Sequence, residues 1–561
     1  MSLHRPACSS LFPTPYLHSV YMMYRNLTLL SLAALSLCAC KPTPRTAHTT
    51  RRPQAPAEQP AQQPAEQPTT PTQQAGEQPS APAQQPAPPL TATQQGEISA
   101  DAPLLIITVT RQGFNRLTPW EKQDSSTRRL SGTYLGNGMV LTYGKALQNA
   151  TYAELSLPDG TRTVPARIVS YDPDLALALL TTAHEQDAAI FDTRHACRPG
   201  EPLLRSQTAE LWCTLNGSEP LKVPLLAQVG TVGDNLPRLS LQANMAVPDV
   251  YAYGAPVMKD GKLAGLSAGY ESTGRKLSII NLELLQRFLQ RPANAPTGTP
   301  SLGIEVATLE DPVFRRYLKL QEGQTGIYIS KVIPVSAAAA ADLREGDVIT
   351  AIEGMKVDNL GRCDLPIYGP THISVASRYL RPLGDTLQLT VSRAGELQDI
   401  TVPLNTDAKD KALLATEQPD KAPRYVVWGG LVFQPLTDTY IQTLKSQAHG
   451  TLPVEFLELE SRSAALREQG ISELTALTLV IPTPTTLGYD NLGFCVVEKV
   501  NGKTPRDFKE FVQLLDEPTP TGLVEFTLNK PPYRIYMEHG SAAAVNDNLR
   551  RNAIPHLRRV E

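Results

Sequence analysis

The sequence predicts a multidomain, mainly β protein behind a long N-terminal tail. Between Ala102 and Gln290, short apolar segments of strand length alternate with turn residues, which is typical of an all-β barrel or sandwich. Beyond residue 300, apolar strands and short helical segments are mixed, which indicates α+β modules. The 561 residues carry a formal charge of −3, and 41% of them are hydrophobic. This composition supports about three or four domains and excludes the basic surface that a nucleic-acid partner requires.

The beginning of the chain has the parts of a secretory signal: a cationic segment, an apolar run at Leu27–Leu37 and small residues before Cys40. The apolar run is too short to span a bilayer stably. Its ending resembles a bacterial lipobox, which implies cleavage before Cys40 and lipidation of that residue. The alternative is an ordinary secretory signal in which Cys40 is removed or left unmodified. We assign residues 1–40 to this signal, and a translation start at Met22 or Met23 stays open.

Residues 41–97 are dominated by Pro, Gln, Ala and Thr. Such a segment cannot bury enough apolar surface to offset the conformational entropy that folding removes. We therefore expect a disordered, partly extended tether between Cys40 and the folded part of the chain.

A turn and hairpin at Tyr251–Leu266 carry the first family resemblance. The segment predicts a Gly/Pro turn, a strand, an Asp-Gly hairpin and a second strand. It resembles the nucleophile hairpin of the HtrA/Deg branch of chymotrypsin-like serine proteases, whose turn is Gly-Asn-Ser-Gly-Gly-Pro. Tyr253 then stands at the position of the serine, and Tyr251 replaces a glycine of the oxyanion turn. A bulky phenol does not supply the compact hydroxyl that acyl transfer needs beside a general base.

Two other segments resemble the remaining parts of the catalytic triad. Leu141-Thr142-Tyr143-Gly144-Lys145 is similar to the family's Leu-Thr-Asn-Asn-His, so Lys145 stands where the base belongs. Asp174, in Asp-Leu-Ala-Leu, matches the triad Asp and is the one position of the three that keeps its residue type. We expect Lys145 to be solvated or paired with Asp174. The resemblance assigns residues 98–292 to a trypsin-like double β-barrel with a degenerate triad.

Cysteines and histidines of this region suggest a disulfide and no metal site. Cys197 and Cys213 are the best disulfide candidates, because secretion would place them in an oxidising compartment. His184 and His195 are isolated from any nucleophile in the sequence, and no Cys/His spacing is typical of zinc. We expect neither a metal nor a cofactor.

A second resemblance begins at Ser301-Leu302-Gly303-Ile304, which is similar to the carboxylate-binding loop of HtrA-type PDZ domains. In such loops, successive backbone N–H groups hold a terminal carboxylate while the peptide adds a strand to the sheet. Downstream, Leu343-Arg-Glu-Gly-Asp-Val-Ile349 fits the PDZ pattern Leu-x-x-Gly-Asp-x-Ile. We assign residues 300–405 to a PDZ domain, with a helix at Ile373–Tyr379 beside its peptide groove.

The rest of the chain, residues 422–561, resembles the second PDZ-like module of the double-PDZ Deg branch and includes a C-terminal extension. Its matching segments are Tyr425–Leu436, Leu479–Pro482 and Val497–Lys503. The loop between its strands is longer than in a simple PDZ domain. Peptide binding and a packing or assembly role therefore both stay open for this module.

These resemblances imply a catalytically inactive HtrA/Deg-like pseudoprotease, lipid-anchored at the bacterial cell envelope and facing the periplasm or the exterior. Its expected partners are peptide C-termini or unfolded proteins, and an active HtrA-type protease of the same compartment. Two alternatives remain. The chain is an active HtrA-like serine endopeptidase whose catalytic residues lie elsewhere, or it is an assembly subunit of a trimer-based Deg-type oligomer.

Overall fold

The computed structural model describes residues 102–561 apart from short gaps, which are residues 216–218, 234, 293–294, 296–297, 335, 406–412, 416–419, 448–458, 460–461, 463–464, 468 and 491. The predicted signal, the candidate lipidation site Cys40 and the predicted linker lie outside the described residues and stay predictions. In the part of the chain that is described, every helix is too short or too polar to cross a membrane.

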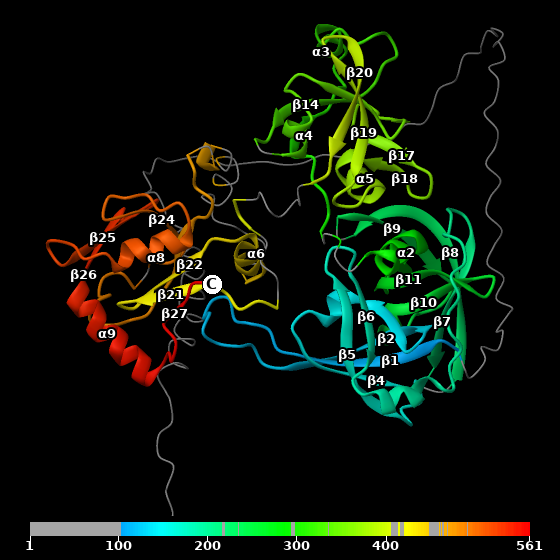
Figure 1. Ribbon diagram of the computed structural model, residues 1–561, viewed down its shortest axis with the longest axis horizontal. Helices are drawn as coiled ribbons and strands as arrows, with labels where there is room; N and C mark the ends of the chain where they lie inside the picture. Colours follow the sequence, from blue (N-terminus) through cyan, green and yellow to red (C-terminus); the bar gives the residue numbers. More distant parts are fainter. Residues whose placement is uncertain are drawn as a thin grey trace, which may run out of the picture. The chain divides into compact units, whose positions relative to one another are not determined.

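The region after Ala102 folds into two closed barrels of six strands each, which confirms the predicted chymotrypsin-like double β-barrel (Figure 1). The first barrel has the order β1-β2-β3-β6-β5-β4 and the second β10-β11-β12-β9-β8-β7. Strands of the first barrel are β1 (Leu104–Arg111), β2 (Ser126–Gly136), β3 (Met139–Tyr143), β4 (Ala150–Ser156), β5 (Thr163–Asp172) and β6 (Leu177–Thr182). Strands of the second are β7 (Thr208–Leu215), β8 (Glu219–Gly233), β9 (Leu236–Ala243), β10 (Tyr253–Lys259), β11 (Lys262–Glu271) and β12 (Lys276–Asn281).

Strand β1 illustrates how side-chain alternation builds the first barrel. Leu105, Ile107 and Val109 are buried in one hydrophobic cluster, whereas Ile106 between them belongs to a different cluster. Successive side chains of a strand point to opposite faces, so a continuous apolar run serves two packed layers at once.

The predicted Asp-Gly hairpin joins β10 to β11. Asp260 and Gly261 have φ values of 51° and 72°, the left-handed conformation that a two-residue type I′ turn requires at both positions. Lys259 pairs with Lys262 across the turn. Two register shifts separate this turn from Tyr253, which is the first residue of β10.

Helix α2 (Leu282–Gln290) follows the second barrel. The side chain of Asn281 caps it by accepting a hydrogen bond from the N–H of Leu282 at 3.1 Å. Leu284, Leu285 and Phe288 are buried, which is the apolar stripe that helical spacing predicts. Three short 3₁₀ turns, η1 (Gly144–Leu147), η2 (Glu185–Phe191) and η3 (Asp249–Tyr251), occur in the connections of the barrels.

The first α+β module has a six-stranded sheet in the order β13-β14-β15-β19-β20, with β16 paired to β15, and a separate β17-β18 hairpin. Its strands are β13 (Ile304–Ala307), β14 (Ile327–Val332), β15 (Val348–Ile352), β16 (Met355–Lys356), β17 (Arg362–Leu365), β18 (Gly369–His372), β19 (Thr386–Arg393) and β20 (Glu396–Pro403). Its helices are α3 (Pro312–Tyr317), α4 (Ala337–Ala340) and α5 (Ile373–Leu380).

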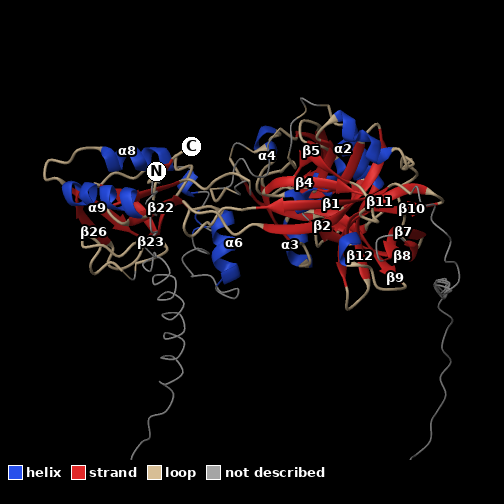
Figure 2. Cartoon of the chain, turned by 90° about the horizontal axis from the view of Figure 1, so that it is seen from below, coloured by secondary structure: helices blue, strands red, loops and turns tan. Residues whose placement is uncertain are grey.

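The second α+β module has a seven-stranded sheet in the order β26-β25-β24-β23-β22-β21-β27. Its elements are β21 (Tyr425–Trp428), β22 (Leu431–Pro435), α6 (Asp438–Gln447), β23 (Thr475–Val480), β24 (Cys495–Val500), α8 (Phe508–Asp516), β25 (Leu523–Leu528), β26 (Arg534–Glu538), α9 (His539–Asn552) and β27 (Arg558–Arg559). Strands predominate throughout the described chain, and the helices are short by comparison (Figure 2). The mainly β fold class is therefore confirmed.

Candidate functional site

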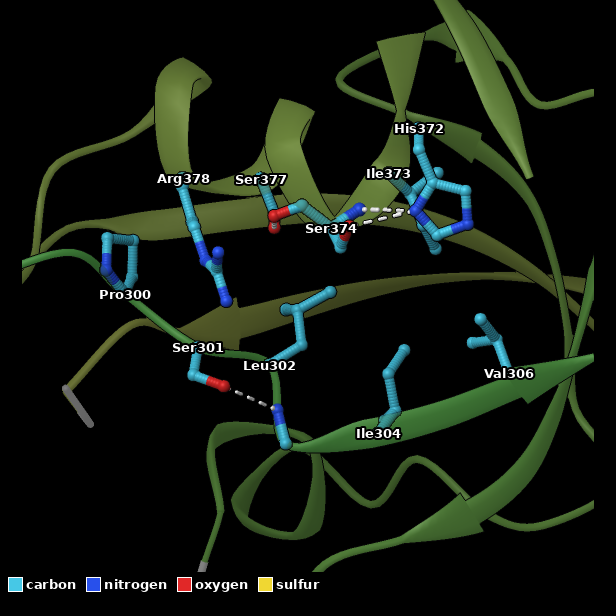
Figure 3. A pocket seen from close by; sticks show the side chains of 11 residues that line it. Pro300, Ser301, Leu302, Ile304, Val306, His372, Ile373, Ser374, Ser377 and Arg378 are labelled. Atoms are coloured by element: carbon cyan, nitrogen blue, oxygen red, sulfur yellow. Dashed lines mark hydrogen bonds between the residues drawn. The ribbon is translucent and has the colours of Figure 1, made fainter. Parts of the chain in front are cut away.

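A groove lies between β13 and α5 of the first α+β module (Figure 3). It encloses a cavity of about 110 Å³. The predicted loop Ser301–Ile304 forms one end of its lining, together with Pro300. Figure 3 shows side chains of α5 facing this loop and the first residues of β13 across the cavity. The four residues predicted from the sequence are thus brought together at one pocket.

The loop conformation depends on Gly303. Its φ is 72°, and a Cβ atom added there would lie 2.2 Å from the Cβ of Ser336, so a side chain fits neither the backbone nor the space. The N–H of Gly303 donates to Oγ of Ser301 at 3.3 Å. The carbonyl oxygens of Leu302 and Gly303 accept hydrogen bonds from backbone N–H groups elsewhere in the module, each at 2.9 Å. The loop is therefore held firmly by its carbonyl groups.

Strand β13 lies at the edge of its sheet. It pairs with β14 on one side, with Ile304 opposite Val332, and it is the outermost strand in the sheet order. An edge strand presents a row of unpaired backbone N–H and C=O groups along its outer side. The groove is thus bounded by a strand that can accept another strand.

The helix wall of the groove is polar except for Ile373, which also lines the pocket. Ser374, Ser377 and Arg378 line the pocket at helical spacing, with His372 at the beginning of α5. The strand wall differs, because Ile304 and Val306 line it with aliphatic side chains that are partly exposed. Sequence analysis missed His372 and Arg378 as site residues. The signal that could have found them is the polar face of the predicted groove helix.

His372 has a defined hydrogen-bonding role. The N–H of Ser374 donates to its Nδ1 at 3.3 Å, and the Ser374 hydroxyl lies 2.8 Å from the same nitrogen. Because Nδ1 accepts, the neutral ring carries its proton on Nε2. Burial lowers the pKa of His372 below its ordinary value, with Asp358 acting in the opposite direction. His372 therefore caps α5 in its neutral form.

The second candidate region is the turn before β10, where Tyr253 occupies the predicted nucleophile position. The rings of Tyr253 and Tyr143 have centroids 5.2 Å apart. The guanidinium carbon of Arg128 lies 4.5 Å from the centroid of the Tyr253 ring, within cation–π range. The ring of Tyr253 thus packs against an aromatic ring and a cation.

Hydroxyl groups of the first barrel hold this turn. Ser131 Oγ donates to the carbonyl oxygen of Val250 at 3.0 Å, and Thr133 Oγ1 donates to that of Gly254 at 3.0 Å. Gly254 has a φ of 82°, and a Cβ atom there would lie 2.2 Å from the carbonyl oxygen of Ser131 and 2.4 Å from Oγ1 of Thr142. The glycine is required by the close approach of the two barrels.

Tyr251 is the residue predicted to replace a glycine of the oxyanion turn. Its side chain is 3% exposed, and its hydroxyl is hydrogen-bonded to Oγ1 of Thr214. Burial raises the pKa of the Tyr251 phenol above its ordinary value. Ser267 Oγ donates to the Tyr251 carbonyl at 2.9 Å and accepts from the N–H of Ala255 at 2.8 Å. The Tyr251 side chain thus fills the turn, and the hydrogen bonds of its hydroxyl and of Ser267 hold the turn in place.

The other two residues predicted to match triad positions, Lys145 and Asp174, lie in the first barrel. Lys145 is on η1 and is partly exposed, and Asp174 is in the turn between β5 and β6. Asp172 organises that turn, since its Oδ1 accepts from the N–H of Asp174 at 2.9 Å. The predicted pairing of Lys145 with Asp174 stays a prediction.

The histidines of the barrels lie at the surface. The sequence of residues 102–290 holds two, His184 and His195, and both are exposed in the structure. An imidazole base in this region would have to come from one of these side chains. Within the described residues, the structure contains no cluster of three or more His, Cys, Asp or Glu that could hold a metal ion.

The predicted disulfide between Cys197 and Cys213 is absent from the structure. Both are free, buried thiols, and they belong to different hydrophobic clusters. Cys197 Sγ lies 3.6 Å from the sulfur of Met258. Burial raises the pKa of each thiol to about 12, so neither is a ready nucleophile. The prediction failed because compartment and spacing say nothing about the geometry that a disulfide needs.

Comparison with known proteins supports the same architecture. Residues 294–365 and residues 414–559 each match a family described as PDZ domain. The chain is 24% identical to Protease Do-like 2, chloroplastic, of Arabidopsis thaliana over 71% of its own length and 65% of that protein. It is 23% identical to Periplasmic serine endoprotease DegP of Escherichia coli strain K12 over 49% of its length and 56% of that protein.

One solved structure similar to the chain is HtrA-type protease AlgW with decapeptide, at 18% identity and a TM-score of 0.39, covering 54% of this chain and 95% of that one. The chain spans about two thirds of the length of Do-like 2 and somewhat less of DegP. One architecture, a double β-barrel followed by PDZ domains, accounts for the Do-like and DegP relatives and for the two PDZ matches. In its sequence matches and its fold, the chain is similar to the HtrA/Deg family.

Proposed function

We propose that this chain is a catalytically inactive HtrA/Deg protein that binds peptide C-termini, including those of unfolded proteins, through the groove of its first PDZ domain. The observation that carries the proposal is the meeting of an outermost strand, β13, with the glycine loop Ser301–Ile304 at one pocket. A peptide can add a strand to β13 while its terminal carboxylate takes the N–H groups of the loop.

Ser301 has a specific part in this binding. Its hydroxyl accepts the N–H of Gly303 at the long distance of 3.3 Å. A carboxylate forms shorter, charge-assisted hydrogen bonds to N–H donors than a hydroxyl does. An incoming peptide terminus would therefore displace Oγ of Ser301 from Gly303, after which the freed hydroxyl can itself donate to the carboxylate.

The filled turn of the barrels supports the absence of catalysis. Acyl transfer needs a compact nucleophile, a base in hydrogen-bond reach and N–H donors around the forming oxyanion. Tyr253 instead packs against Tyr143 and Arg128, and Lys145 stands at the position of the base. The names of the relatives favour the second candidate, an active endopeptidase that uses other residues.

The proposal also covers the cellular location of the protein and the proteins that it would bind. We place the protein at the bacterial cell envelope, anchored through lipidated Cys40 and reaching its partners on the linker of residues 41–97. The DegP relative is described as periplasmic, which supports an envelope location. In that setting the protein would hold exposed chain ends or deliver them to an active HtrA-type protease.

Peptide binding by the full chain tests the proposal. Fluorescein-labelled peptides with five randomised residues and a free carboxylate should raise the fluorescence polarisation, whereas amidated peptides should not. Gly303→Ala should weaken binding at least tenfold, because the added methyl group collides with Ser336. Gly354→Ala is the matched control, since Gly354 also has a positive φ, 76°, but has open space where its Cβ would lie.

Equal binding of free and amidated peptides would contradict the proposal. So would an unchanged affinity in Gly303→Ala. Circular dichroism of both glycine variants shows whether a loss of binding comes from a local change in the groove or from unfolding of the chain.

A further inference from the structure

We propose that the second α+β module is a binding site for the hairpin that joins β1 to β2, and that this internal segment, rather than the end of another protein, is the ligand of the module. The inference is independent of the proposed peptide groove, which lies in the first PDZ domain. It gives the second module a packing role, one of the two roles that its sequence left open.

The hairpin has an ordered tip, residues 115–121. The N–H of Asn115 donates to the carbonyl oxygen of Glu121 at 3.0 Å across the tip. Oδ1 of Asn115 accepts hydrogen bonds from the N–H groups of Leu117 and Thr118, at 3.0 and 3.3 Å. The shape of the tip is therefore held by its own hydrogen bonds, which reduces the conformational entropy that is lost on binding.

The apolar side chains of the tip pack on the second module. Leu117 lies against a hydrophobic cluster whose other members all come from residues 413–496. Trp120 lies against a separate cluster whose other members all come from residues 425–557, and its ring meets that of Tyr425 edge to face, with centroids 6.2 Å apart. Both side chains thus find their apolar surroundings in the module and not in the barrel that carries them.

Polar side chains of the module bind the backbone of the tip. Nε2 of Gln434 donates to the carbonyl oxygen of Arg116 at 3.2 Å and to Oγ1 of Thr478 at 2.9 Å. Gln434 is 3% exposed, and a buried amide group without a hydrogen-bond partner costs free energy. Nη1 of Arg559 donates to the carbonyl oxygen of Pro119 at 3.4 Å. The module therefore supplies donors to two carbonyl groups of the tip.

Strand β27 completes the surface to which the tip binds. Arg559 of this strand pairs with Tyr425 in the sheet, and its guanidinium carbon lies 5.5 Å from the centroid of the Tyr425 ring. The same ring contacts Trp120. The last strand of the chain thus fixes both the ring and the arginine at the place where the tip docks.

Hydrogen exchange of the full chain, read by mass spectrometry, tests the contact from the side of the tip. Trp120→Ala should speed the exchange of the backbone amides of β21 and β27 about tenfold, as expected for the loss of one buried aromatic contact. Exchange in the strands of both barrels should stay unchanged. Trp120→Phe should retain part of the protection, because an aromatic ring remains against Tyr425. Asp124→Ala is the matched control, since Asp124 is exposed on the same hairpin beyond the tip, and it should change nothing.

Limited proteolysis with trypsin tests the contact from the side of the module. Arg116 is 8% exposed, whereas Lys122 on the same hairpin is exposed, so the wild type should be cut after Lys122 well before it is cut after Arg116. Gln434→Leu removes the donor to the Arg116 carbonyl and should speed cleavage after Arg116 about fivefold, without a change at Lys122. Arg559→Gln, at a partly exposed position, should act in the same direction. Circular dichroism shows whether each variant is folded.

Three outcomes would overturn the inference. Unchanged exchange of β21 and β27 in Trp120→Ala would show that the tip does not bind the module. Equal rates of cleavage after Arg116 and Lys122 in the wild type would show that the tip is not docked in solution. Exchange in β21 and β27 that speeds up when the wild type is diluted would assign the bound tip to a second copy of the chain, because a contact within one chain does not depend on concentration.

Discussion

At the scale of single residues, Tyr253 is the side chain predicted to stand where an active HtrA protease has its serine. The sequence predicted its position at the turn, and β10 indeed begins with it. The packing partners were not predictable. Arg128 lies on β2, more than a hundred residues earlier in the chain. A local sequence pattern cannot show that two such distant residues come into contact when the barrels fold. For the same reason the sequence did not show that Cys197 and Cys213 lie in different cores.

This packing predicts that the Tyr253 ring stabilises the barrels. Tyr253→Ala should lower the free energy of unfolding by about 1–3 kcal/mol, because it removes the contacts with Tyr143 and Arg128. Tyr253→Phe should cost less than about 0.5 kcal/mol, since the ring and its faces remain. Thermal unfolding of the full chain and both variants checks this. Equal melting temperatures for the alanine and phenylalanine variants would show that the ring contributes nothing.

At the scale of elements, the regular pieces were predictable and their non-local contacts were not. The groove helix was expected at Ile373–Tyr379, and α5 occupies Ile373–Leu380, because local apolar spacing determines a helix. Strand β27 was not predicted from the sequence. Its two residues, Arg558 and Arg559, pair with β21, more than a hundred residues away. A strand of two residues is too short to show the alternation of apolar and polar residues that predicts a strand.

Helix α5 should respond to pH through its cap. Burial lowers the pKa of His372 in the folded chain, so between that value and its ordinary 6.5 the unfolded chain binds the proton more readily. Stability that is complete above pH 6.5 is lost as the pH falls through the folded-state pKa, where protonated Nδ1 no longer accepts from Ser374. His372→Asn keeps a capping acceptor without titrating.

Urea unfolding at pH 7.5 and pH 5.5 compares the wild type with this variant. The wild type should lose more stability than His372→Asn between the two pH values, and peptide affinity should follow the same trend. An identical pH dependence in both chains would refute the capping role of neutral His372.

At the scale of the whole molecule, two modules of one family differ in how their sheets end. The first PDZ domain leaves β13 at the sheet edge beside its glycine loop. In the second module, β22 follows Gly429 and Gly430 but is flanked by β21, and β21 is flanked by β27. In the second module, the strand that follows the glycine pair is thus already paired on both sides. Peptide capture is therefore expected from the first PDZ domain, with the barrels as the scaffold that presents it.

Fluorophosphonate labelling of the purified full chain, read by intact mass with an active HtrA protein as positive control, shows whether the protease scaffold retains protease chemistry. We expect no adduct on the wild type and none on Tyr253→Ser, because Lys145 is predicted to stand at the position of the imidazole base. A stoichiometric adduct on the folded wild-type chain, abolished by substitution of the labelled residue, would contradict this expectation.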